Sequence, residues 1–240
     1  MGVKYSRDET VKEIGSKLGN IASLYKEKCI NWSGKTKDKK PGFYSEIIAD
    51  ELIKSGIKDL LQEIKPISRN NYKVDRHTGK IPKITIREEE IFAKDLFNYC
   101  KAGNDPGEIG VIIDYQVPLK ANQNDDAGKI DLISFSKDDG VIYLLELKGK
   151  NSKETLLRCI LEISTYYRLL DKENFIKSYS IPRTTSIKKS ILICHDSQQH
   201  DEIKKIQSGQ RLKMKDLFDV LEVRIFLINH KNFQINSVSL

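Results

Sequence analysis

The chain has 240 residues, with 41 Lys or Arg against 34 Asp or Glu, so its formal net charge is +7. This length suits one enlarged domain or two small ones. No apolar stretch reaches the length of a membrane span, and no signal peptide precedes the first charged helix, which argues against membrane and secreted proteins. The four cysteines are widely spaced without a Cys-x-x-Cys pair, so we expect buried, reduced thiols and a cytoplasmic location.

The first 80 residues predict helices joined by a polar linker. Apolar residues recur at helical spacing in the first helix: Val11, Ile14, Leu18, Ile21 and Tyr25. A second helix is expected over residues 43–55, ended by Gly56, and residues 65–83 predict a long loop or small irregular insertion. We divide the chain into an N-terminal helical region, residues 1–80, and a second domain, residues 81–240. The N-terminal region is a candidate for target recognition or dimerisation.

A helix is expected over residues 85–102, followed by a strand over residues 109–119. Three glutamates lie in the first turns of this helix: Glu88, Glu89 and Glu90. Helical geometry places Glu88 and Glu89 beside the apolar face and directs Glu90 away from it. Glu88 also fits a capping box with Thr85, which explains its presence without a metal.

Two apolar runs separated by an Asp-Asp-Gly turn predict a β-hairpin over residues 130–135 and 141–147. The second run contains one charge, Glu146, as is typical of a central strand buried on both faces. Side chains alternate along a strand, so Glu146 and Lys148 share one face. Asp131 begins the first run, and we expect the adjacent strands to bring these three side chains together.

A carboxylate and an ammonium at the end of a buried strand are costly to desolvate unless something pairs them. The pairing can be mutual, or it can come from a metal ion. Glu-x-Lys at a strand end is also common as a surface ion pair, so Glu146 and Lys148 alone are weak evidence for chemistry. The combination with Asp131 on the partner strand is more specific.

A further helix is expected over residues 152–171, with Ser152 at its start. Polar residues recur every four positions along it and form one row: Glu154, Arg158, Glu162 and Tyr166. For Glu154 and Arg158 we favour an ion pair on a solvated face. Tyr166 is less easily explained in this way, because Glu-x-x-x-Tyr beside an acidic strand end can face the same pocket.

The last part of the chain predicts an extension of the sheet. Residues 190–194 read as a buried strand, and a polar helix, a helix over residues 213–221 and a strand over residues 223–229 follow. Basic residues cluster in the linker at residues 35–40 and toward the C-terminus. Such clusters suit contacts with phosphates, and a solvated basic surface explains them equally well.

Asp131, then Glu146-x-Lys148, then a helix with Glu162-x-x-x-Tyr166 resembles the PD-(D/E)xK nuclease superfamily. The helix motif is similar to that of the RecB-like branch, where glutamine is usual in place of Glu162, and Ile130 replaces the proline of the family name. The similarity covers roughly residues 84–195. The family fold is a helix, three strands, a helix and a further strand, and the predicted elements follow that order. The resemblance implies an α/β, restriction-endonuclease-like fold with a mixed central sheet flanked by helices, here with an N-terminal helical extension.

The resemblance also implies a divalent-metal-dependent nuclease that hydrolyses phosphodiester bonds in DNA, in phage defence, restriction or repair. Asp131 and Glu146 would bind Mg²⁺, with Mn²⁺ as a second candidate. Many family members add a glutamate from the first helix, and we choose Glu88 over Glu89. A metal ion lowers the pKa of its bound water, and Lys148 would orient that water or stabilise the developing charge.

Glu162 and Tyr166 are auxiliary residues in this interpretation. The implied partner is nucleic acid, with DNA expected. The choice between DNA and RNA, and between a homodimer and a larger defence complex, stays open. A second hypothesis is a nucleic-acid-binding or regulatory module on a nuclease fold whose chemistry has lapsed. The intact Asp131, Glu146 and Lys148 favour the enzyme, and cleavage assays with added metal distinguish the two.

Overall fold

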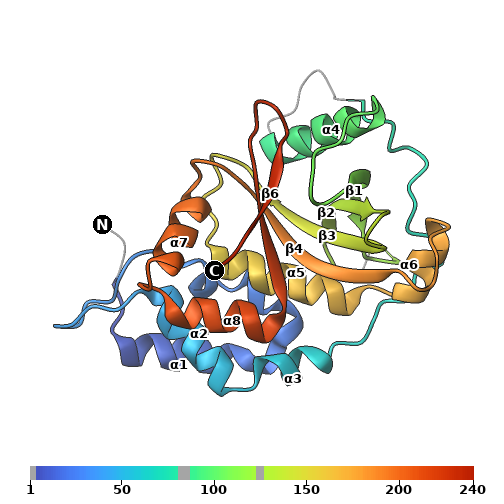
Figure 1. Cartoon of the computed structure of the whole chain (residues 1–240). Helices are drawn as coiled ribbons and strands as arrows, with labels where there is room; N and C mark the ends of the chain where they lie inside the picture. The colour runs from blue at the N-terminus through green and yellow to red at the C-terminus, as the bar shows by residue number, and fades with distance from the viewer. Residues whose placement is uncertain (1–3, 81–86, 123–126) are drawn as a thin grey trace.

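A six-stranded mixed sheet lies between layers of helices in the computed structural model, which describes residues 4–80, 87–122 and 127–240 (Figure 1). The strands occupy the sheet in chain order: β1 (Val111–Pro118), β2 (Lys129–Ser136), β3 (Val141–Lys148), β4 (Ser186–Cys194), β5 (Val223–Ile228) and β6 (Ile235–Val238). The first three strands form an antiparallel meander, β4 and β5 run parallel to β3, and β6 is antiparallel to β5. The predicted α/β fold with a mixed sheet flanked by helices is confirmed.

Helices precede the sheet, cover it and connect its strands. In the described residues before the sheet they are α1 (Arg7–Lys17), the 3₁₀ segments η1 (Leu18–Lys26) and η2 (Lys28–Asn31), α2 (Tyr44–Lys54), α3 (Ile57–Gln62) and α4 (Glu88–Lys101). Those after β3 are α5 (Leu156–Leu169), α6 (Lys172–Ser178), α7 (Gln198–Gln207) and α8 (Leu212–Leu221). No helix in this part of the chain is long and apolar enough to cross a membrane.

The two faces of the sheet contact different hydrophobic cores. On β3, Ile142 and Leu144 join the core that contains α1, α2, α5 and α8, whereas Tyr143 and Leu145 join the core under α4. Helices α4 and α5 therefore cover opposite faces, as Figure 1 shows. Glu146 continues the alternation of Ile142 and Leu144, so its side chain lies on the α5 face. All four cysteines are free and buried in these cores, as expected.

The N-terminal helices share a core with the rest of the chain. Ile14 of α1 and Leu52 of α2 belong to the same buried cluster as Leu156 and Ile160 of α5. In Figure 1, α5 lies between the sheet and helices α1 to α3. Among the described residues, the boundary that we placed at residue 80 therefore does not separate two hydrophobic cores. A role of this region in recognition or dimerisation stays a prediction.

The N-terminal region also determines where α5 begins. Thr155 is the N-cap, its hydroxyl accepting from the backbone N–H of Arg158 and donating to the carbonyl of Ile30. The backbone N–H of Thr155 donates to Asn31 Oδ1 at 2.6 Å. The predicted start at Ser152 is wrong by one turn, because these long-range hydrogen bonds select Thr155 from several possible caps. Glu154 consequently precedes the helix.

Other differences concern short elements. The prediction missed α3, α6 and the strand β6, which are too short or too polar to show a clear period. The first predicted helix ends at Lys17 and continues as 3₁₀ turns interrupted by a non-helical Asn20. Residues 65–80 form the predicted irregular segment, and residues 81–83 lie outside the described part. Thr85, the partner in the predicted capping box, also lies outside it.

Candidate metal and catalytic site at the ends of β2 and β3

Asp131 and the end of β3 meet through the backbone. The β2–β3 ladder ends at Leu132 opposite Leu145, and beyond it the backbone N–H of Leu147 donates to Asp131 Oδ2 at 2.9 Å. The Asp131 carboxylate thus accepts the hydrogen bond of a backbone N–H that would donate to a carbonyl of β2 if the β2–β3 ladder continued. This contact holds Asp131 beside Glu146 and Lys148, and the predicted convergence of the three residues is confirmed.

Gln116 of β1 contacts the other oxygen of Asp131. Its Nε2 donates to Asp131 Oδ1 at 2.7 Å, and its backbone is left-handed, with φ of +48°. A left-handed conformation in a non-glycine residue costs about 1–3 kcal/mol and is concentrated at functional sites. Strand alternation cannot reveal such a residue, so sequence reasoning missed Gln116.

Lys148 is the cation that several carboxylates share. Its Nζ lies 2.7 Å from Glu146 Oε1, 2.6 Å from Glu154 Oε2 and 3.8 Å from Glu89 Oε2. Glu146 and Lys148 are only 3% and 4% exposed. Glu154 is therefore part of the site, which its predicted place on a solvated helix face did not suggest.

Arg158 supplies a second positive charge. Its Nε lies 3.0 Å from Glu154 Oε1, as the predicted ion pair requires, and 3.7 Å from Glu162 Oε2. The expected solvated face is found only in part, because Glu154 and Arg158 are partly buried, and Glu162 of the same row is buried. Across the described residues of this cluster, five carboxylates face two cations: Glu89, Asp131, Glu146, Glu154 and Glu162 against Lys148 and Arg158.

The excess of carboxylates changes their protonation. Burial raises the pKa of Asp131 to about 6, with Lys148 and the Leu147 N–H opposing the rise. Burial, Asp131 and Glu162 together raise the pKa of Glu146 well above its ordinary value. Burial alone would lower the pKa of Lys148, but Glu146 and the other carboxylates raise it well above its ordinary value. The cluster therefore lacks positive charge when its carboxylates are ionised.

The donor atoms suit a hard divalent cation. Glu146, Glu154 and Glu162 each direct one carboxylate oxygen so that the three lie within 4.8 Å of one another, and Asp131 is held close by through Leu147. Mg²⁺ and Mn²⁺ prefer such oxygen ligands. Sequence reasoning identified Asp131 and Glu146 and missed the overlapping set completed by Glu154 and Glu162.

The glutamates of α4 reach different parts of the site. Glu89 Oε1 accepts from the backbone N–H of Gly149 at 3.1 Å, and its Oε2 faces Lys148. Glu88 Oε2 instead accepts from Asn151 Nδ2 at 2.9 Å. Both glutamates line a pocket of about 530 Å³ together with Asp131. The contacts thus favour Glu89 over Glu88 as the helix carboxylate that joins the cluster.

Tyr166 lies behind the carboxylates and orients one of them. Its hydroxyl donates to Glu162 Oε1 at 2.7 Å, and the ring of Tyr25 packs edge-on at 5.6 Å. Burial and the charge of Glu162 raise the pKa of Tyr166, so its hydroxyl stays neutral and donates. The predicted Glu162–Tyr166 pair is thus formed, with Tyr166 4% exposed.

Gly128 allows Tyr166 to approach the start of β2, and Gly128→Ala should destabilise the protein by about 1–3 kcal/mol. An added Cβ would lie 2.6 Å from Tyr166 Cζ and closer still to its hydroxyl. Urea unfolding measures the change, with Gly15→Ala as the matched control. A Cβ at Gly15 meets nothing within 4 Å, and in the interior of α1 it should stabilise by about 0.5–1 kcal/mol. Equal effects of the two substitutions would contradict the close packing of Tyr166.

The arrangement can bind a cation, hold a water or phosphate oxygen beside Lys148, and keep a neutral tyrosine hydroxyl on one of its carboxylates. No family model, curated protein or solved structure matches the chain.

Proposed function

We propose that this protein is a divalent-metal-dependent nuclease that hydrolyses phosphodiester bonds in DNA, with roles in phage defence, restriction or repair. The observation that carries the proposal is the joint position of Asp131, Glu146 and Lys148 at the ends of two neighbouring strands. Two carboxylates can hold a metal ion that activates water, and the buried ammonium beside them can stabilise the charge that develops on the phosphate during hydrolysis. The combination is more specific than any of the three residues alone.

The order of elements supports the same proposal. Helix α4, strands β1 to β3, helix α5 and strand β4 follow one another as in the PD-(D/E)xK superfamily. The antiparallel meander and the parallel β3–β4 pair carry Glu146 and Lys148 on a central strand. We therefore interpret the mixed sheet as a restriction-endonuclease-like fold, extended by β5, β6 and the N-terminal helices.

Asp131 and Glu146 would hold Mg²⁺ or Mn²⁺, with Glu89 or Glu154 completing the protein ligands. The bound ion would lower the pKa of a water and polarise the phosphoryl oxygen. Lys148, released from part of its carboxylate contacts, would donate to the attacking water or to a phosphate oxygen as negative charge develops. Gln116 and the Leu147 N–H would keep Asp131 oriented toward the ion.

A cationic pocket beside the carboxylates suits the flanking phosphates of a nucleic acid. This pocket, of about 480 Å³, shares Glu90 and Gln116 with the pocket at Asp131. Four cations line it: Arg76, Lys80, Lys94 and Lys129. Phosphates are bound by such groups with little dependence on sequence.

The segment that supplies two of these cations is attached firmly to the sheet. His77 Nδ1 lies 2.6 Å from Asp114 Oδ1, and its ring stacks on Tyr115 with centroids 4.4 Å apart. The backbone N–H of Gly79 donates to the Tyr115 hydroxyl at 3.1 Å. These contacts would hold Arg76 and Lys80 in position before DNA binds, which lowers the entropic cost of binding.

Glu89→Gln should weaken Mg²⁺ binding about tenfold or more, whereas Glu88→Gln should leave it unchanged. Glu89 contacts Gly149 and faces Lys148, but Glu88 is held by Asn151. Isothermal titration with MgCl₂ measures the Mg²⁺ affinity of both variants. The two are matched controls, because each replaces one carboxylate by an amide at neighbouring positions of α4. A larger loss of Mg²⁺ affinity in Glu88→Gln than in Glu89→Gln would indicate that Glu88 is the metal ligand.

A cleavage assay tests the proposed function. Purified protein is incubated with supercoiled plasmid, linear duplex and single-stranded DNA in Mg²⁺, in Mn²⁺ and in EDTA. We expect cleavage with either metal, none in EDTA, and none by Asp131→Asn in any buffer. Tight DNA binding without cleavage under both metals would instead support the lapsed nucleic-acid-binding module.

A further inference from the structure

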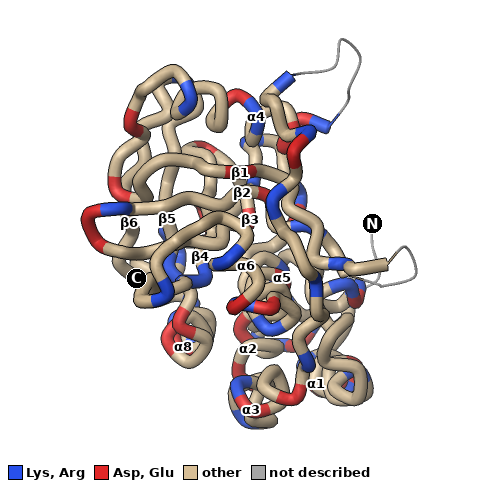
Figure 2. The backbone as a smooth tube through the Cα atoms, turned by 90° about the vertical axis from the view of Figure 1, so that its right-hand side faces the viewer, with Lys and Arg blue, Asp and Glu red and all other residues tan. Residues whose placement is uncertain are grey.

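A second cationic pocket lies away from the carboxylates, at the start of β4. It has a volume of about 590 Å³ and lies between α3, the end of α5, β4 and the turn from α8 to β5. Its basic lining residues are Lys58, Arg168, Lys188, Lys189 and Arg224, against the acidic Asp219 and Glu222. Figure 2 shows Lys and Arg segments gathered near the labels of β4 and β5, on the side of the sheet toward α8.

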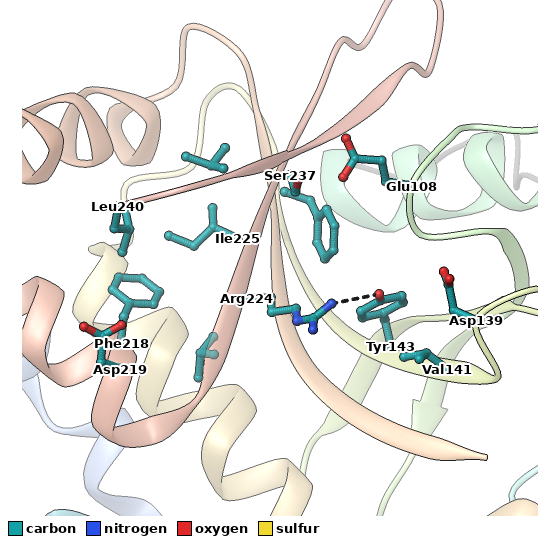
Figure 3. A pocket seen from close by; sticks show the side chains of 13 residues that line it. Glu108, Asp139, Val141, Tyr143, Phe218, Asp219, Arg224, Ile225, Ser237 and Leu240 are labelled. Atoms are coloured by element: carbon teal, nitrogen blue, oxygen red, sulfur yellow. Dashed lines mark hydrogen bonds between the residues drawn. The ribbon is translucent and has the colours of Figure 1, made fainter. Parts of the chain in front are cut away.

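Part of this charge is already paired. Lys58 forms an ion pair of 2.8 Å with Glu222. Arg224 directs its guanidinium into the adjoining pocket of about 690 Å³, where Nη1 donates to the Tyr143 hydroxyl at 3.1 Å (Figure 3). Lys188 pairs in register with Tyr143, so its side chain lies on the α4 face of the sheet. The groups that remain on the α5 face to receive a ligand are Arg168 and Lys189.

Lys189 is the cation most affected by its surroundings. It is partly buried, its Nζ lies 5.1 Å from the centre of the Tyr167 ring, and Lys172 lies over the same ring at 3.7 Å. Burial, together with Arg168, Lys58 and Lys172, lowers the pKa of Lys189 to about 8, while Glu222 opposes the decrease. Lys188 and Arg224 on the strands and Asp219 on α8 also line the pocket. An anion placed here would relieve this repulsion.

A buried hydroxyl lies against the same pocket. Ser164 of α5 lines the same pocket and is 2% exposed. Within the described part of the chain, its Oγ has no hydrogen-bond partner. Leaving a buried hydroxyl without a hydrogen-bond partner is unfavourable. The Ser164 Oγ is covered by protein atoms in the free protein, so its side chain would have to rotate toward the pocket to donate to a phosphate oxygen.

We propose that this pocket binds a nucleoside di- or triphosphate, with its phosphates on Arg168 and Lys189 beside Ser164. The apolar side chains of Leu61, Ile187 and Phe218 also line the pocket and suit the nucleoside. Several cations around one compact volume match a polyphosphate better than a backbone phosphodiester, which carries one charge per nucleotide. The proposal goes beyond the nuclease function and does not depend on it.

The pocket and the carboxylate cluster are separate but share α5. Lys189 pairs with Leu144 in the β3–β4 register, four residues before Lys148, which corresponds to roughly 13 Å along the strand. Glu162 faces the carboxylates from the same helix on which Ser164 and Arg168 line the second pocket. A ligand there would contact the helix that carries Glu162.

Calorimetric titration tests the proposal. Full-length protein is titrated with ADP and with pyrophosphate in EDTA at pH 8 and constant ionic strength, so that the metal site contributes nothing. We expect Arg168→Ala and Lys189→Met to weaken ADP binding at least tenfold, and the control Lys12→Met to leave it unchanged. Lys12 is exposed on α1, and its substitution by Met removes the same charge as Lys189→Met.

Proton uptake provides a readout that a structural role would not change. Lys189 is partly deprotonated at pH 8, and a bound phosphate raises its pKa, so ADP binding should take up protons. Titrations in two buffers of different ionisation enthalpy measure this uptake, which should disappear in Lys189→Met. If Lys189→Met does not fold, a second experiment takes its place: bound ADP should protect Lys189 of the parent protein from chemical acetylation.

Three results would overturn the proposal. They are no binding of ADP or pyrophosphate, unchanged binding by Arg168→Ala and Lys189→Met, and binding of a DNA oligonucleotide through these residues without binding of ADP. The last result would assign the pocket to the nucleic acid backbone. DNA cleavage is measured separately, so failure of the nuclease proposal remains distinguishable.

Discussion

Lys148→Met should reduce metal-dependent DNA cleavage by roughly 10²–10³-fold, the usual cost of removing one group that stabilises transition-state charge. It should also lower the melting temperature of the metal-free protein by on the order of 10 °C, because one cation of a buried cluster is lost. Glu146 and Glu154 would lose the ammonium that lies 2.7 and 2.6 Å from them. Lys148 is only 4% exposed, so its removal should affect the stability of the protein as well as its activity.

Activity assays and thermal unfolding with and without Mg²⁺ separate the two effects of Lys148→Met. Mg²⁺ should restore much of the stability, because the ion replaces the lost positive charge, but it should not restore cleavage. Lys148→Arg should also stay inactive, since a planar guanidinium is not a compact point charge. Lys137→Met, on the exposed hairpin turn, is the control. Cleavage by Lys148→Met at the parental rate would contradict the assigned role.

Asp131→Asn should abolish cleavage and yet stabilise the metal-free protein at neutral pH by about 2–3 kcal/mol. The pKa of Asp131 is about 6 in the folded protein against an ordinary 3.8. Between these values the folded state binds more protons than the unfolded state, so stability falls as the pH rises through this window. An asparagine cannot ionise, and it can still accept from the Leu147 N–H.

Urea unfolding between pH 4 and pH 8 in EDTA measures this effect. The stability of the parent should decline from pH 4 to pH 6, and the decline should be smaller in Asp131→Asn. Asp138→Asn removes the same charge from the exposed hairpin turn and serves as the control. A loss of stability in Asp131→Asn at pH 7 would contradict this prediction. It would show that Lys148 and the hydrogen bonds to Asp131 already balance its negative charge without a metal.

The sheet was predictable because its strands are apolar runs between turns. The predicted strands at residues 109–119, 130–135, 141–147 and 223–229 match β1, β2, β3 and β5 closely. β4 begins four residues earlier than expected, since the mostly polar segment from Ser186 to Lys189 precedes the buried apolar run. β6 has a single buried residue, Ile235, and depends on pairing with β5, which no local pattern reveals.

The candidate site was predictable only where strand geometry determines it. Alternation and the hairpin suffice to bring Asp131, Glu146 and Lys148 together. Glu154 was misplaced because the start of α5 depends on Asn31 and Ile30, more than a hundred residues away. Gln116 requires a left-handed residue within a strand, and a uniform helical phase could not distinguish Glu88 from Glu89.

The hydrogen bonds from Thr155 to Asn31 and Ile30 restrict how this chain can be re-engineered or diversified. A fragment that starts after residue 80 would expose the outer surface of α5 to water and free the turn that carries Glu154. Exchanging the first 80 residues for those of another protein would therefore alter the carboxylate cluster as well as any recognition surface. Substitutions in residues 1–80 must therefore be compatible with the rest of the chain, and recombination with another protein at residue 80 is disfavoured.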